Sequence, residues 1–339
     1  MIIEGHDTSK QVFVIAEIGN NHEGSFDLAV EMIEKAALSG ANAVKFQTIL
    51  PEFLVSVSDQ ERIKRLKKFQ FSYAQFEELK KIAVSQNVIF FSTPFDLKSA
   101  SFLNTIQSVF KIASGDNNFY PLIDEVTSYG KPMIISTGLS DMGLLNNIYK
   151  RVTDKWNELS KAPGLAFLHC MTSYPVPDNE ANLACIQELK IKFPDLTIGY
   201  SDHTTGIKAA QYAVAAGARI VEKHFTIDKN YSDFRDHQLS ADPADMKAMI
   251  EGIKEIELMM GSAERLNDQC EKGMHEAARR SIVSITDLAS NTVITKDHLT
   301  WVRPGNGLAP GSENLLIGKR TNKTIGAGSI ITMNDIVSE

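Results

Sequence analysis

Short apolar runs rich in β-branched and aromatic residues recur along the first two-thirds of the chain, with helical patterns between them. The runs predict eight strands, near 12–17, 43–47, 88–92, 109–113, 132–136, 165–169, 196–200 and 219–224. Apolar residues with the 3.6-residue period predict helices over 26–38, 74–86, 206–216 and 243–261. Strand–helix alternation repeated eight times favours a closed parallel (β/α)8 TIM barrel over an open sheet.

Nearly every predicted strand ends in, or is closely followed by, a polar residue capable of chemistry. These residues are Glu17, Lys45, Gln47, Thr93, Lys111, Ser114, Ser136, Tyr174, Ser201, His203 and His224. In a TIM barrel the C-terminal ends of the strands converge on one mouth, where the active site lies. Two lysines, several hydroxyls, two histidines and a carboxylate in one ring suit an anionic substrate held beside a metal ion.

The alternation of side chains along each strand predicts which residues face the barrel interior. Lys45 and Gln47 share a face, while bulky Val44 and Phe46 take the other face and suit the helix-packed outside. The same parity places His224 inward at the rim, with Glu222 one layer deeper on the same face. Because a buried charge without a partner is costly, charged groups that face one interior are expected to pair or to bind a ligand.

Composition narrows the class of protein. The chain has 339 residues and a net charge of −7, which argues against a nucleic-acid partner. Three cysteines without a CxxC pair suit a reducing compartment. The N-terminus has no apolar signal core and no 18-residue apolar stretch occurs, so we expect no membrane association and a cytoplasmic location.

The C-terminal part has a different character. We predict a barrel domain over 1–262, a polar linker over 263–281 and a small β-rich domain over 282–339. The last domain contains an internal repeat, in which segments near 288–299 and 325–336 both read as a turn, an apolar pair, Thr and then Asp. Between the copies, Arg303 precedes Pro304-Gly305 in a loop that can present its side chain at a tip.

Within the barrel part, the charged stretch from Asp59 to Lys68 predicts a solvated helix.

His203 and His224 end the seventh and eighth strands, which are neighbours in a barrel. Imidazole is a common ligand of first-row divalent metals, and two protein ligands would leave positions for water and substrate. His169 and Cys170 close the sixth strand and suit a packing role as well as a functional one.

A set of motifs in this order resembles the sialic acid synthase family across essentially the whole chain. The motifs are AEIGNNHEGS (16–25), AVKFQT (43–48), FSTPFD (91–96), KIASGD (111–116), STG (136–138), YPVP (174–177), GYSDHTTG (199–206) and EKHFT (222–226). The terminal repeat and WVRPGNG (301–307) resemble that family's antifreeze-like (SAF) domain. The resemblance implies condensation of phosphoenolpyruvate with an N-acetylmannosamine-type sugar, giving a nine-carbon α-keto acid and phosphate. The product would be N-acetylneuraminate or a legionaminic-type acid.

The resemblance also implies roles for individual residues. The phosphoenolpyruvate contacts would be Lys45, Thr93, Lys111, Ser114, Ser136 and Ser201, and the sugar contacts Glu17, Gln47, Tyr174, Asp236 and Arg303. The catalytic set would be Glu17, Lys45, Lys111, Asp116 and Asp236. His203 and His224 would hold the divalent metal, commonly Mn²⁺, with Mg²⁺ and Co²⁺ as alternatives. The family's two-fold dimer is domain-swapped, so Arg303 would serve the partner's site.

Two departures from the family pattern are informative. Asp116 stands where many members carry Glu, which leaves its role open. Thr172 stands where enzymes that make N-acetylneuraminate tend to have Asn. This leaves the acceptor sugar open and makes the chain more similar here to relatives that make legionaminic-type acids.

Two other functions remain alternatives. One is a synthase acting on a phosphorylated aldose, which a second basic cluster would favour. The other is a non-catalytic carbohydrate-binding protein, which would need neither the lysine nor the histidine set.

Overall fold

A computed structural model describes residues 1–234, 236–264 and 269–337. The chain divides into two compact units, Met1–Gly261 and Ser262–Glu339. The predicted linker falls in the second unit and carries the helix α12 (Lys272–Ala278), while its residues 265–268 lie outside the described part. In the part of the chain that is described, no helix is both long enough and apolar enough to cross a bilayer.

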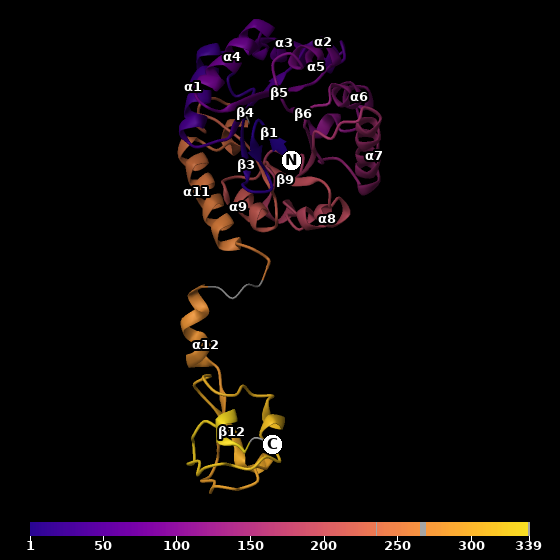
Figure 1. Ribbon diagram of the computed structural model, residues 1–339. Helices are drawn as coiled ribbons and strands as arrows, with labels where there is room; N and C mark the ends of the chain where they lie inside the picture. The colour runs from indigo at the N-terminus through magenta and orange to yellow at the C-terminus, as the bar shows by residue number, and fades with distance from the viewer. Residues whose placement is uncertain (235, 265–268, 338–339) are drawn as a thin grey trace. The chain divides into compact units, whose positions relative to one another are not determined.

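The first unit is a (β/α)8 barrel, as predicted, built on an eight-stranded sheet in the order β5-β4-β3-β10-β9-β8-β7-β6 (Figure 1). Every strand ladder within it, in the described part of the chain, is parallel. The strands are β3 (Phe13–Gly19), β4 (Ala43–Thr48), β5 (Ile89–Pro94), β6 (Phe110–Ile112), β7 (Met133–Ser136), β8 (Leu165–Cys170), β9 (Thr197–Asp202) and β10 (Ile220–His224).

The helices that follow these strands surround the sheet (Figure 1). They are α1 (Phe26–Leu38), α4 (Tyr73–Ser85), α5 (Leu97–Leu103), α6 (Tyr120–Tyr129), α7 (Met142–Glu158), α8 (Cys185–Lys192), α9 (Lys208–Ala215) and α11 (Pro243–Met260). Side-chain caps fix several helix starts. Ser25 accepts from Leu28 N at the start of α1, and Ser72 forms a capping box with Gln75 before α4.

Short additional helices lie in the loops. They are α2 (Pro51–Leu54), α3 (Gln60–Phe69) and α10 (Asp236–Leu239). The solvated helix expected near Asp59–Lys68 is α3, in which Ile63 is the buried residue.

The side chain of Gln107 links the two ends of the sheet order. Its Oε1 accepts from Ser92 N at 2.8 Å and its Nε2 donates to Ser92 O at 3.2 Å. Ser92 belongs to β5, and Gln107 shortly precedes β6. A buried amide therefore satisfies both backbone groups of one residue at this junction.

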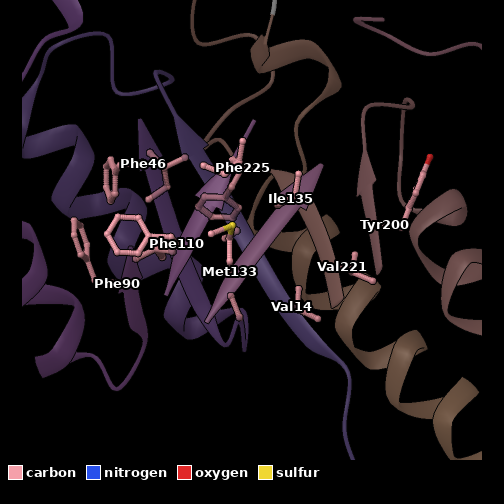
Figure 2. Packing of buried hydrophobic residues seen from close by; sticks show 14 of the residues in the cluster. Val14, Phe46, Phe90, Phe110, Met133, Ile135, Tyr200, Val221 and Phe225 are labelled. Carbon is pink, nitrogen blue, oxygen red and sulfur yellow. The ribbon is translucent and has the colours of Figure 1, made fainter. Parts of the chain in front are cut away.

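Two apolar layers lie on the two faces of the strands. Val14, Phe46, Phe90, Phe110, Tyr200 and Val221 belong to the large cluster between strands and helices (Figure 2). The inner cluster contains Phe13, Ile15, Ala43, Phe91, Val109, Ile134, Ala166, Leu168 and Ile220. Ile3, from the N-terminal hairpin of β1 (Ile2–Ile3) and β2 (His6–Asp7), joins this inner cluster. The interior is therefore apolar near the strand starts, and the polar groups lie at the strand ends.

The second unit contains a small antiparallel sheet of β11 (Ser281–Ser284) and β12 (Leu299–Val302) around its own apolar cluster. The sequence repeat is also a structural one. Thr295 and Thr332 each cap a short 3₁₀ turn, Lys296–His298 and Met333–Asp335, through the same capping box. The bridge between Leu288 and Ile325 joins the starts of the two copies.

Candidate active site

Most of the predicted site residues surround one small cavity, of about 60 Å³, at the C-terminal ends of the strands. Its lining includes Glu17, Lys45, Gln47, Thr93, Lys111, Ser114, Ser136, Tyr174, Ser201, His203 and His224. Phe95, Ala113, Cys170 and Glu222 complete it. Asp116 and Asp236 do not line this cavity, and Arg303 lies exposed in the second unit. A larger cavity of about 570 Å³ borders α7 and α8 and shares with the small one only Cys170.

Two lysines and two glutamates alternate at the base of the cavity. Lys45 Nζ lies 2.6 Å from Glu17 Oε2 and 3.7 Å from Glu222 Oε2. Lys111 Nζ lies 3.3 Å from Glu222 Oε1, so Glu222 bridges the two lysines. All four side chains are buried. They come from β3, β4, β6 and β10 and meet because the inward face of each strand points at the same axis, as strand parity predicts.

Hydroxyl groups extend this ionic cluster. Lys45 Nζ donates to Thr93 Oγ1 at 3.0 Å, and Lys111 Nζ donates to Ser136 Oγ at 2.6 Å. Ser201 Oγ donates to Glu222 Oε1 at 3.0 Å. Each ammonium group thus has a carboxylate and a hydroxyl neighbour. The hydroxyls of Thr93 and Ser136 accept from the ammonium groups, so each has its own proton left to donate.

The pKa directions follow from burial and from this pairing. Burial opposes the charge on Lys45, but Glu17 and Glu222 raise its pKa above the ordinary value. Burial lowers the pKa of Lys111, with Lys45 adding to the effect and Glu222 opposing it. Burial raises the pKa of Glu17, whereas the two lysines hold the pKa of Glu222 below its usual range against the cost of burial. Glu17 is therefore the carboxyl in this cluster better suited to carry a proton.

A network of amides holds the carboxylate of Glu17 in place. Gln47 Nε2 donates to Glu17 Oε1 at 3.0 Å, and Asn20 Nδ2 donates to Gln47 Oε1 at 2.9 Å. Gly19 makes this packing possible. Its φ is +56°, and a Cβ there would lie 3.1 Å from Glu17 Oε1 and 3.3 Å from Gln47 Nε2. A larger residue would press on both groups and strain the backbone.

His203 and His224 lie side by side, with ring centroids 5.4 Å apart. His203 Nδ1 lies 2.9 Å from the carbonyl oxygen of Met171, an arrangement in which Nδ1 carries the proton and Nε2 keeps its lone pair. His224 Nδ1 is buried and has no hydrogen-bond partner among the described residues. Burial lowers the pKa of His224 well below its usual value, with His203 contributing, so the neutral ring is favoured.

These features fit a divalent metal ion. Two imidazoles at the ends of adjacent strands, one with a buried nitrogen that lacks a partner among the described residues, are the ligand type that first-row metals prefer. Burial opposes the charge on His203, but Cys170 and the carbonyl of Met171 raise its pKa above the ordinary value, so a metal bound there would compete with a proton. Within the described ranges, no group of three or more His, Cys, Asp or Glu side chains forms a candidate site. Substrate or water would have to complete the coordination, as in catalytic metal sites generally.

Tyr174 covers the histidine pair. Its ring centroid lies 4.2 Å from that of His203 and 6.0 Å from that of His224. Burial raises the pKa of the Tyr174 hydroxyl, which therefore stays protonated and able to donate.

Asp236 is the first residue of α10, in the loop after β10, and its side chain is half-buried. Residue 235, which precedes it, lies outside the described residues.

Four lining residues were not part of the predicted set, and two of them, Glu222 and Cys170, carry groups that ionise. Glu222 was placed inward by strand parity, but its bridging role depends on side chains from two distant strands. Cys170 Sγ accepts from Ser114 Oγ at 3.4 Å and lies 3.8 Å from His203 Nδ1. The sequence feature that could have indicated Cys170 as a site residue is its position at the end of the sixth predicted strand, next to His169. His169 does not line this small cavity; it borders the larger one, and its Nε2 lies 2.8 Å from the carbonyl oxygen of Ala181.

Asp116 lies at the end of the 3₁₀ turn Ser114–Asp116, and its Oδ2 is buried without a hydrogen-bond partner in the described part of the chain. Burial raises the pKa of Asp116 to about 6, from an ordinary value of 3.8. The folded state therefore binds this proton more tightly than the unfolded state. The cost of ionisation is absent below pH 3.8, grows as the pH rises and is complete above about pH 6.

Replacing Asp116 with Asn should remove that cost, because an amide does not ionise. We expect Asp116→Asn to raise the free energy of unfolding by about 1–2 kcal/mol at pH 8, with the gain shrinking as the pH falls below about 6. Urea unfolding of both proteins at pH 4.5 and pH 8 measures the difference. Asp154→Asn, at an exposed position of α7, is the matched control. A gain for Asp116→Asn that did not depend on pH would contradict this account.

The fold and the cavity together define a TIM-barrel protein with a mouth lined by cations, carboxylates and histidines, joined to a small β domain. Known proteins share this organisation. Residues 32–265 match the NeuB family and residues 279–337 match the SAF domain. The chain belongs to the NeuB family, the group of sialic-acid-type synthases.

Individual relatives support this placement. An N,N'-diacetyllegionaminic acid synthase of Campylobacter jejuni is 34% identical, over 93% of this chain and 97% of its own length. The N-acetylneuraminate-9-phosphate synthase of Homo sapiens is 32% identical, over 92% of this chain and 89% of its own. The crystal structure of an N-acetylneuraminic acid synthetase from Leptospira borgpetersenii, in complex with citrate, superposes with a TM-score of 0.74. It is 34% identical and covers 78% of this chain and 90% of that one.

Proposed function

We propose that this protein condenses phosphoenolpyruvate with an acetamido sugar of the N-acetylmannosamine type, giving a nine-carbon 2-keto-3-deoxy acid and phosphate. The observation that carries the proposal is the buried Lys45–Glu222–Lys111 bridge beside the His203/His224 pair. Two ammonium groups with neighbouring hydroxyls can bind a carboxylate and a phosphate, while the histidine pair and Glu17 lie beside them. A protein that only binds carbohydrate has no need for this combination.

Charge balance links the anion site to the proposed metal site. Glu17 and Glu222 offset Lys45 and Lys111, so the four groups carry a net charge near zero when all are ionised. A multiply charged anion bound there needs further positive charge nearby. A divalent metal held by His203 and His224, for which we propose Mn²⁺, would supply that charge. When bound, it would also act as a Lewis acid toward the aldehyde oxygen of the open-chain sugar.

The chain's own groups would then perform distinct tasks. Lys45, Lys111 and the hydroxyls of Thr93, Ser114, Ser136 and Ser201 would hold phosphoenolpyruvate. Gln47, Tyr174 and Asp236 would orient the sugar, with Glu17 placed to give or take a proton at the reacting oxygen.

In the reaction itself, the methylene carbon of the enol forms a bond to the aldehyde carbon, whose oxygen takes up a proton. The carbon that bears the phosphate becomes cationic, and water adds to it and loses a proton. The new hydroxyl then loses its own proton and becomes the keto oxygen as the C–O bond to phosphate breaks, and phosphate leaves. We further propose that the protein acts as a two-fold dimer in which Arg303 of one chain completes the sugar site of the other.

The acceptor sugar is the finer part of the proposal. Thr172 stands two residues before Tyr174, where enzymes that make N-acetylneuraminate tend to have Asn, and two relatives are named as legionaminic acid synthases. We therefore propose a 2,4-diacetamido sugar as the preferred acceptor, with N-acetylmannosamine as the second candidate. The human relative's name contains a 9-phosphate, which makes a phosphorylated N-acetylmannosamine the third compound for the test.

Phosphate release from phosphoenolpyruvate, measured with Mn²⁺ and each of these three sugars, tests the function. We expect release only when an acetamido sugar is present, and most with the diacetamido compound. Phosphoenolpyruvate labelled with 18O at the bridging oxygen should give labelled phosphate, because the C–O bond breaks. Label found in the keto acid would rule out this mechanism, and release that did not require a sugar would rule out the condensation.

A further inference from the structure

A lysine and an aspartate form a fully buried ion pair on the outer face of the barrel wall, behind the two histidines. Lys223 Nζ lies 3.0 Å from Asp202 Oδ2, and neither side chain is accessible to solvent. The two residues are direct partners in the β9–β10 ladder. Each of them immediately precedes a histidine, so Asp202 leads into His203 and Lys223 into His224. The ion pair therefore joins the two segments that carry the proposed metal ligands.

The remaining bonds of this pair hold the backbone around His203. Asp202 Oδ1 accepts from Thr204 N and from Thr204 Oγ1, both at 2.8 Å. Lys223 Nζ makes a second bond to Thr204 O, at 2.6 Å. The carbonyl of His203 itself accepts from Val176 N at 2.9 Å. The peptide group that follows His203 is thus held on both its carbonyl and its N–H, and Lys223 ties the next carbonyl, that of Thr204, directly to β10.

Stability alone does not explain a charged pair at this place. The surrounding layer between strands and helices is mainly apolar, as Val221 shows on β10 (Figure 2) and Ile198 on β9. Tyr200 adds one polar contact there, because its hydroxyl donates to Asp202 Oδ1 at 3.3 Å. Buried ion pairs are often no more stable than apolar residues of the same size, because desolvation offsets the attraction. What such a pair adds is geometry, since each partner accepts only a narrow range of positions.

We propose that Lys223 and Asp202 are positioning residues for the metal site: their ion pair fixes the spacing of the His203 and His224 imidazoles so that both bind one divalent cation. The inference rests on the metal site of the proposed function. Neither residue touches substrate or metal, since both side chains lie on the opposite face of the strands. Bonds that orient the ligands of a metal commonly contribute 10- to 100-fold to metal affinity, and we expect the same scale here.

The sign of the effect separates positioning from simple electrostatics. Lys223→Met removes a positive charge from the neighbourhood of the cation, so Coulomb interactions alone would strengthen metal binding. Loss of positioning would weaken it. The same variant leaves Asp202 buried and unpaired, which costs stability. The double variant Asp202→Leu with Lys223→Met avoids that problem, because it replaces both groups with apolar side chains of similar size.

The test is a titration of the full-length protein with Mn²⁺ alone, with free Mn²⁺ followed by electron paramagnetic resonance. We expect Lys223→Met and the double variant to bind Mn²⁺ about tenfold or more weakly than the unmodified protein. The double variant should keep the folded circular dichroism spectrum, with a lower melting temperature because the buried N–H, hydroxyl and carbonyl of Thr204 lose their partners. Arg219→Met is the charge-matched control. Arg219 lies just before β10, at the other end of the barrel, and pairs with Glu257 at 3.2 Å; its loss should leave Mn²⁺ affinity unchanged.

Unchanged or tighter Mn²⁺ binding by the double variant would overturn the positioning role, and this variant decides the matter if Lys223→Met does not fold. His203→Ala in the same titration keeps the two proposals distinct. Mn²⁺ binding that survived His203→Ala would contradict the proposed metal site itself. Loss of binding in His203→Ala together with full binding in the double variant would leave the metal site intact and remove only the role of the ion pair.

Discussion

Replacing His203 or His224 with alanine is expected to lower the rate of phosphate release at least about a hundredfold, the scale for loss of one major electrostatic stabiliser. The two rings lie side by side at the ends of β9 and β10, and His224 Nδ1 is buried without a partner in the described chain. Residues at this rim support chemistry more than they support the fold. The melting temperature should therefore change little. Turnover with added Mn²⁺, measured beside thermal unfolding, gives both quantities.

His6→Ala is the control for this experiment. His6 lies in the N-terminal hairpin, where its Nε2 contacts the carbonyl of Gln11 at 3.0 Å, and it is not part of the cavity. Its replacement should leave turnover unchanged. Near-normal activity of both rim variants after chelator treatment would show that the histidines do not hold a required metal.

The sequence was sufficient to predict the barrel because the patterns that indicate its strands and helices lie within each segment of the chain. Each strand shows its faces through alternation, so Lys45 could be placed inside and Phe46 outside before any contact was known. The structure has Phe46 in the outer cluster and Lys45 paired with Glu17 across the interior. The first helix was also predicted with its observed bounds from its apolar period, and in the structure the cap at Ser25 fixes its start.

Features that depend on long-range pairing could not be predicted in the same way. Glu222 was placed on the inward face, but its position between Lys45 and Lys111 is set by barrel closure, which brings β4 and β6 to the same axis. The sequence around Gln107 does not indicate that its side chain bonds both backbone groups of Ser92. An amide side chain in a loop has no periodicity, so its partner is visible only once the sheet is assembled.

The outward-facing charges were the least predictable feature. The alternation of side chains places Lys223 among apolar neighbours, where burying a lysine is costly. The sequence near Lys223 does not indicate that Asp202 is its partner. The ladder register supplies that partner directly opposite on β9. The polar groups on both faces of β9 and β10 thus belong to one arrangement: the inner face carries the histidines, and the outer face holds the peptide segments that present them.

Mixing two inactive variants is expected to restore activity if Arg303 serves the partner's site in a two-fold dimer. Lys45→Ala removes an ammonium group from the barrel site but keeps Arg303, whereas Arg303→Ala has an intact barrel site. Arg303 is exposed in the second unit, after β12, and its five donors suit a ligand rich in hydroxyl and acetamido groups. Each variant alone should be nearly inactive in phosphate release.

Refolding an equal mixture should recover roughly a quarter of normal activity. Half of the dimers would contain one chain of each kind. In such a dimer one site combines Lys45 of the Arg303→Ala chain with Arg303 of the Lys45→Ala chain, so one of its two sites is intact. Mixing without refolding is the control, because subunits that do not exchange should show no recovery. Activity after refolding no greater than the mean of the two variants would mean that Arg303 acts on its own chain or has no part in the site. Full activity of Arg303→Ala alone would single out the second possibility.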